Sequence, residues 1–235
     1  MSYPGGSSPA GPGGRRMNVR SWLKISVDLA MTLCLLALMC FQSTGPAVHE
    51  VLGCAMFLLL LLHTALNLRW YAALARGGWT PLRVCQTLLD FAAASVLTAQ
   101  ALSGMHISGL LGLSRGMELA RSIHLACGWW SFVLISLHAG MHLSFAGGLA
   151  RLALGTAHKH VFPAFRAAAA VLALCGAREF LRSNAIPCLT LKAGFAFFDF
   201  SKSAVSVAAS NFSIMVFFML AGSVCFWLLA RISAK

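Results

Sequence analysis

Four histidines lie inside long apolar stretches of the sequence, at two equal intervals. His49 and His63 are 14 residues apart, and so are His124 and His138. Fourteen residues of α-helix rise about 21 Å and rotate to within about 40° of the start, so each stretch should present two imidazoles on one face. Histidine is rare inside membrane spans and is usually functional there. If the two stretches pack side by side, His49 lies level with His124 and His63 with His138.

Two facing pairs of imidazoles, one above the other, are what two stacked haems with two axial histidines each require. The expected cofactors are therefore two haem b groups, an outer one on His49/His124 and an inner one on His63/His138, without the CxxCH motif of covalent attachment. Two imidazole ligands leave iron no open coordination position, which favours one-electron transfer. No residue is therefore predicted to be catalytic. Hydrogen bonds between helices, a zinc site or a proton relay are the alternatives for these histidines.

The segments around the two pairs resemble each other, so the second helical hairpin looks like a repeat of the first. At an offset of 75 residues they share His49/His124, Gly53/Gly128, Phe57/Phe132, Leu59/Leu134, Leu62/Leu137 and His63/His138. Gly53 and Gly128 each follow the outer histidine by four residues, on the same helix face. Their missing side chains would let a flat macrocycle approach the backbone, or would equally serve close helix packing.

Two further residues accompany the histidines of the second segment. His142 follows His138 by four residues and matches Asn67 of the first segment; it could be an alternative ligand, part of a quinone pocket, or a structural hydrogen-bond partner. Arg121 precedes His124 by three residues and could bind an outer haem propionate, although a solvated or lipid-facing arginine fits equally well.

Three other polar residues have open roles. Asp28 and Asp90 are acids well inside apolar segments, where they could relay protons for a quinone on the inner side. An ion pair with Lys24, one helical turn away, is the plain explanation for Asp28. His106 is expected in a long outer loop, 103–115, beside a flavin or quinone entrance.

The composition indicates that these segments lie in a lipid membrane. Of 235 residues, 59% are hydrophobic and only 10% are charged, which excludes a water-soluble protein. The net charge of +12 is consequently interpreted as a topology signal and a contact with anionic lipid, with no nucleic-acid partner. Six apolar segments are expected to span the membrane: 22–41, 49–71, 82–102, 123–149, 165–180 and 204–229.

The fifth segment is short and spans only if Arg166 and Arg178 reach the two interfaces. With both termini in the cytoplasm, the predicted inside segments carry 12 Lys and Arg residues and the outside segments 6. The predicted fold is all-α, a polytopic transmembrane bundle. Residues 1–20 form a disordered basic tail, 21–150 a four-helix dihaem core and 151–235 a two-helix extension.

The sequence resembles the flavinylation-associated cytochromes, a family of bacterial b-type membrane cytochromes similar in haem layout to respiratory cytochrome b. The resemblance covers the whole chain except the first 20 residues. It rests on five segments: HEVLG from His49, LLLLLHTALNLRW to Trp70, HISGLLGLS from His106, IHLACGWWSFVLISLHAGMH to His142 and LKAGFAFFDF from Leu191. It implies a protein of the bacterial inner membrane that transfers electrons between a quinone and an extracytoplasmic flavoprotein carrying covalent FMN. Such a protein is an electron-transfer subunit rather than a stand-alone enzyme.

Two other classes of protein fit the same sequence. One keeps the haems but serves as the membrane anchor subunit of a dehydrogenase or hydrogenase-type complex. The other is a non-redox transporter or structural protein, although the sequence lacks the paired helix breaks that many transporters have.

Overall fold

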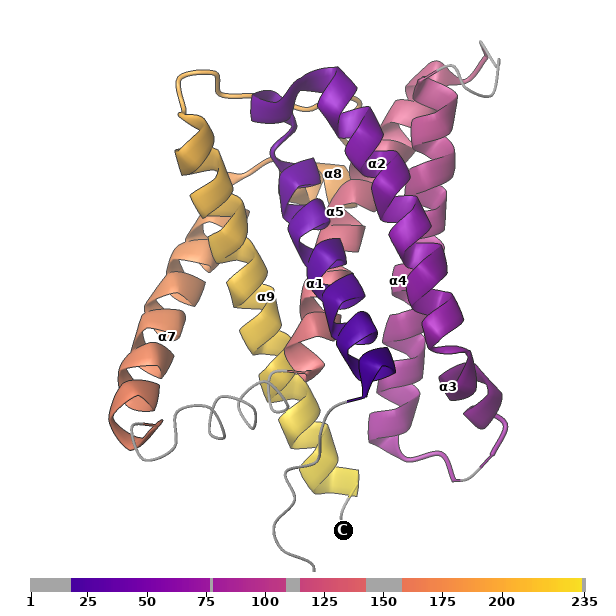
Figure 1. Cartoon of the computed structure of the whole chain (residues 1–235). Helices are drawn as coiled ribbons and strands as arrows, with labels where there is room; N and C mark the ends of the chain where they lie inside the picture. The colour runs from indigo at the N-terminus through magenta and orange to yellow at the C-terminus, as the bar shows by residue number, and fades with distance from the viewer. Residues whose placement is uncertain (1–17, 77, 109–114, 143–157, 234–235) are drawn as a thin grey trace, which may run out of the picture.

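The computed structural model describes residues 18–76, 78–108, 115–142 and 158–233, with side chains from residue 162 onwards in the last range. Within these ranges the chain is all-helical, as predicted, and contains no strand. Figure 1 shows long helices that run alternately up and down, with one short helix near the lower end of the bundle and another inside its upper half. The helices are α1 Val19–Met39, α2 Phe41–Leu66, α3 Leu68–Ala73, α4 Pro81–Ile107, α5 Met117–Met141, α7 His158–Arg182, α8 Ala185–Leu189 and α9 Ala204–Ser233.

Five of these helices, α1, α2, α4, α5 and α9, are long and apolar enough to cross a bilayer. Exposed leucines such as Leu33, Leu58 and Leu88 lie along them, as contact with lipid requires. The chain is thus a multi-pass membrane protein. The predicted span over 165–180 lies in α7, where Arg166, Arg178 and Glu179 interrupt the described apolar stretch, so that sixth span stays a prediction.

Local chemistry explains where several helices begin and bend. Asn18 caps α1 by accepting a hydrogen bond from the Ser21 N–H at 3.1 Å, so the helix starts before the predicted end of the tail at residue 20. The predicted break before the second span is confirmed at Gly45, whose φ of 74° and ψ of 173° are not helical, and at Pro46, which lacks an N–H; α2 consists of two helical pieces that meet there at a kink. The first turn of α2 therefore lies at an angle to the rest of the helix (Figure 1).

The expected loop at 103–115 begins later than predicted. Helix α4 continues to Ile107, and the Ser103 hydroxyl donates within the helix to the Ala99 carbonyl at 2.8 Å instead of breaking it. His106 consequently lies in the last turn of α4, and its predicted place in a loop is wrong. Residues 109–114 lie outside the described ranges. Helix α5 starts at Met117, six residues before the predicted span.

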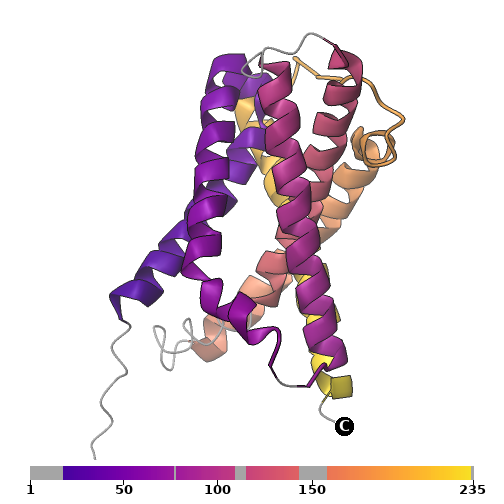
Figure 2. The same cartoon turned by 90° about the vertical axis from the view of Figure 1, so that its right-hand side faces the viewer.

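The helices form antiparallel pairs, α1 with α2, α4 with α5 and α7 with α9 (Figures 1 and 2). The start of α1 and the end of α9 lie at the same end of the bundle, here called the inner end, and the opposite end is the outer end. At the inner end Arg83 stacks over Trp79 and Arg231 over Trp227, with 5.2 Å and 3.8 Å between guanidinium carbon and ring centre. Such rings are typical of a membrane interface.

Helix α9 supports α5, the helix that carries His124 and His138. A Cβ atom on Gly140 would overlap the Met219 carbonyl, and one on Gly222 would overlap the Leu137 carbonyl, so the two backbones are in direct contact. Phe132 on α5 is fully buried beside Ile214 and Met215 of α9. The close approach of small residues fixes the position of α5, as in many membrane bundles.

Candidate functional site

The outer histidines face each other from two helices that do not pack together. The ring centres of His49 on α2 and His124 on α5 are 6.1 Å apart, with 71° between the ring planes. No described Cα atom of α2 lies within 8 Å of one in α5, so the two imidazoles reach across a gap between the backbones. The predicted level arrangement of these two rings is present in the structure.

Helix α4 holds the His124 ring on three sides. The Gln100 amide donates to Nε2 at 3.1 Å, and Nδ1 lies 3.2 Å from the Gln100 carbonyl and 3.3 Å from the Ser103 hydroxyl. A Cβ atom on Gly104 would lie 3.1 Å from Cε1 of His124. These partners were missed from the sequence, where the only signal was a glutamine in an apolar span followed by small residues at i+3 and i+4.

His49 has a sparser environment. Its Nδ1 is buried without a hydrogen-bond partner of good geometry, and the Leu38 backbone of α1 interacts with the ring. No atom lies within 4 Å of a Cβ built on Gly53, so packing against another helix does not explain that glycine. At Gly128, in contrast, the Cβ would contact the Gln100 amide at 3.4 Å.

Each inner histidine is paired with an aspartate of the neighbouring helix. Nδ1 of His63 lies 2.7 Å from Oδ1 of Asp28, and Nδ1 of His138 lies 2.6 Å from Oδ1 of Asp90. The Asp28 side chain is 54% exposed and that of Asp90 19%. The two aspartates, unassigned in the sequence, are thus direct partners of the two histidines.

The predicted ion pair between Lys24 and Asp28 is wrong. Lys24 donates instead to the Asn67 side-chain oxygen at 2.6 Å, and the Asn67 amide lies 3.3 Å from Nε2 of His63. Because His63 occupies the Asp28 carboxylate, the lysine binds the neutral amide one turn beyond it. An amide donor at Nε2 leaves Nδ1 of His63 as the protonated nitrogen.

The repeat predicted for α2 and α5 extends to α1 and α4. In each hairpin the first helix offers a carboxylate to the inner histidine and, ten residues later, a main-chain carbonyl to the outer one: Asp28 and Leu38, then Asp90 and Gln100. The offset between these two helices is 62 residues rather than 75. The first helices share too few residue types for this relation to be visible in the sequence.

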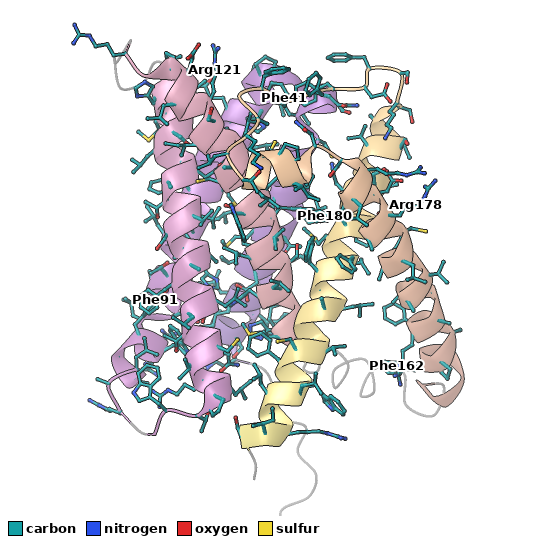
Figure 3. All side chains as sticks on the ribbon, turned by 180° about the vertical axis from the view of Figure 1, so that it is seen from behind. Phe41, Phe91, Arg121, Phe162, Arg178 and Phe180 are labelled. Carbon is teal, nitrogen blue, oxygen red and sulfur yellow. The ribbon has the colours of Figure 1, made fainter. Side chains whose placement is uncertain are left out.

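The remaining candidates occupy different places. His142 packs against His138 with 5.2 Å between ring centres and lies within electrostatic range of Asp28, Asp90 and His63. No ring contact joins His63 to His138 in the part of the chain that the structure describes. Arg121 is exposed at the outer end, with no hydrogen bond or ion pair to another described residue (Figure 3), as a solvated arginine would be.

An aromatic loop between α8 and α9 covers the outer end beside His49. Phe198 of this loop stacks on Phe41 at 5.4 Å between ring centres, and Phe41 meets the His49 ring edge-on at 5.0 Å. The backbone N–H and hydroxyl of Ser201 donate to the Asp199 carboxylate, and these hydrogen bonds hold its pKa below the usual carboxyl range. Asp199 therefore has a structural part in this loop.

Comparisons with known proteins give this site no relative: no family, curated protein or solved structure matches the chain. Among the residues with described positions, no group of three or more His, Cys, Asp or Glu side chains is arranged to hold a bare metal ion. The side chains of His158 and His160 lie outside the described part.

Proposed function

We propose that this protein is a dihaem b-type cytochrome that carries electrons across a membrane. One observation carries the proposal: the His49 and His124 rings face each other although the helices that bear them do not pack together. Two imidazoles on one iron place their ring centres about 6 Å apart, because a metal–imidazole nitrogen bond is about 2 Å and the ring centre lies about 1 Å behind the nitrogen. The observed 6.1 Å agrees with that spacing.

The surroundings of the outer pair fit such a group. The Gln100 carbonyl would accept a hydrogen bond from the Nδ1–H of His124, which leaves the Nε2 lone pair for a ligand bond. The flexible Gln100 amide that now donates to Nε2 would swing aside. Next to His49, the open space at Gly53 leaves room for a flat macrocycle. The buried Nδ1 of His49 has no hydrogen-bond partner, and the ring would gain one by a small rotation when a ligand binds.

The inner pair would hold a second haem through Nε2 of His63 and of His138, because an aspartate occupies Nδ1 in each. The Asn67 amide that now donates to Nε2 of His63 would have to move aside. Haem with two imidazole ligands would supply one-electron transfer without a site for oxygen. The 14-residue spacing would set the two haem levels about 21 Å apart along each helix, roughly two-thirds of the about 30 Å thickness of the hydrocarbon core. Moving one charge fully across is worth about 2.3 kcal/mol per 100 mV.

The remaining parts of the proposal rest on the family resemblance and on the distribution of charge. The protein would lie in the bacterial inner membrane with its inner end in the cytoplasm, where the positive charges gather. It would connect a quinone to an extracytoplasmic flavoprotein with covalent FMN, which would dock at the outer end. A haem-containing anchor of a dehydrogenase or hydrogenase-type complex would use the same core with a different partner.

The test is haem content in single-histidine variants of the full-length protein, purified in detergent. Pyridine haemochrome analysis should give two haem b groups per wild-type chain and one per chain in His49→Ala or His124→Ala. His106→Ala is the matched control, because this half-buried histidine of the same bundle has no place in either pair, and it should keep both haems. Haem-free wild-type protein would favour the non-redox transporter or structural protein, and histidine variants that keep both haems would refute His49 and His124 as ligands.

A further inference from the structure

The outer and inner levels of the site differ in the charge of the acceptor groups that the neighbouring helices place beside the histidine rings. At the outer level the neighbouring helices offer main-chain carbonyls, from Leu38 and Gln100. At the inner level they offer carboxylates, from Asp28 and Asp90, and this difference occurs in both hairpins. Because the repeat preserves it, the difference belongs to the architecture rather than to one local contact.

We propose that Asp28 and Asp90 are positioning residues for the inner haem, which orient its two ligands and lower its reduction potential below that of the outer haem. The inference rests on the proposed function and deepens it. Both contacts are at the length of charge-assisted hydrogen bonds, 2.7 Å and 2.6 Å. Both fall on Nδ1, the nitrogen whose hydrogen bond fixes the tautomer and the ring orientation of a ligating imidazole.

The electronic consequence follows from the charge of the acceptor. A carboxylate attracts the Nδ1 proton more strongly than a carbonyl does, which makes the imidazole a better electron donor at Nε2. A stronger donor stabilises oxidised iron relative to reduced iron, so the reduction potential falls. Lys24, one helical turn from Asp28, donates to Asn67 and forms no ion pair with Asp28.

A purely structural hydrogen bond between helices is the competing explanation, since buried polar pairs often join membrane helices. The two explanations differ in what the negative charge does. If the pairs only join helices, an amide that preserves the hydrogen bond should serve as well as the carboxylate. If they act on the iron, the amide should keep the haem but change its potential.

The experiment is a spectroscopic redox titration of full-length protein carrying Asp28→Asn or Asp90→Asn, after haem content has been measured. Each variant should retain two haems, and one of the two should become easier to reduce, by about tenfold in its equilibrium constant, which is 59 mV for one electron. The other haem should not change. Asp28→Glu, which restores a carboxylate, should return the potential towards the wild-type value.

Glu118→Gln is the matched control, because this exposed acid lies in the first turn of α5 at the outer end, far from the inner pair. It should leave the inner potential unchanged. Unchanged potentials in both asparagine variants with full haem content would overturn the inference, as would equal shifts of both haems. If one variant does not fold, the other tests the same claim from the second hairpin. A wild-type protein without haem would instead refute the proposed function, and the two failures are therefore distinct.

Discussion

The contact between α5 and α9 gives a prediction that tests how the histidine helix is held. In Gly140→Ala the added methyl group would meet the Met219 carbonyl, a backbone atom that cannot rotate away, so the two helices must separate. Overpacking of this kind costs about 1–3 kcal/mol. Gly53→Ala is the matched control when both variants are measured without haem: it makes the same change in another spanning helix, where no atom lies within 4 Å.

Both variants gain up to about 1 kcal/mol of helix propensity, so the difference between them isolates the overlap. For a chain of this size 1 kcal/mol shifts the melting temperature by about 2–4 °C, and we therefore expect Gly140→Ala to melt about 5 °C below Gly53→Ala. Thermal unfolding in one detergent, followed by circular dichroism, measures this difference. Equal melting temperatures would show that α9 does not touch α5 at Gly140, and would refute the packing described here.

Two further predictions concern the ends of the bundle. His138→Ala should lose one haem, whereas His142→Ala should keep both, because only His138 has a carboxylate on Nδ1; haemochrome analysis of the two variants distinguishes them, and the opposite result would make His142 the ligand. In the outer loop, the lowered pKa of Asp199 means that its hydrogen bonds with Ser201 stabilise the loop above the ordinary carboxyl pKa and weaken as the pH falls through the lowered value. The protection of the Ser201 amide against hydrogen exchange, relative to its intrinsic rate at each pH, should fall on that acidification in the wild type and show no such step in Asp199→Asn.

The sequence was most informative where a regular spacing within one helix determined the geometry. The 14-residue interval predicted that His49 and His124 would lie level on two helices of the same direction, and the structure has them in contact. The apolar segments predicted the five spanning helices for the same reason, since hydropathy acts over a continuous stretch. The break at Gly45 and Pro46 was also predicted, but other helix ends were less accurate, because Ser103 hydrogen-bonds within α4 instead of ending it.

Partners from different helices could not be predicted in the same way. Asp28 and His63 are 35 residues apart and Asp90 and His138 are 48 apart, so their pairing depends on how the helices of each hairpin are rotated. The sequence offered Lys24 as the nearer partner of Asp28, and only the packing of α1 on α2 gives that place to His63. Helix rotation is determined by packing between side chains, which the sequence pattern leaves open.

The central claim is that two irons are each held by two histidines, and electron paramagnetic resonance of the oxidised, purified protein tests it most directly. Two imidazoles on each iron should give two low-spin ferric centres per chain and no high-spin signal. A protein without ferric haem signals, or one dominated by a high-spin centre with an open coordination position, would contradict the account.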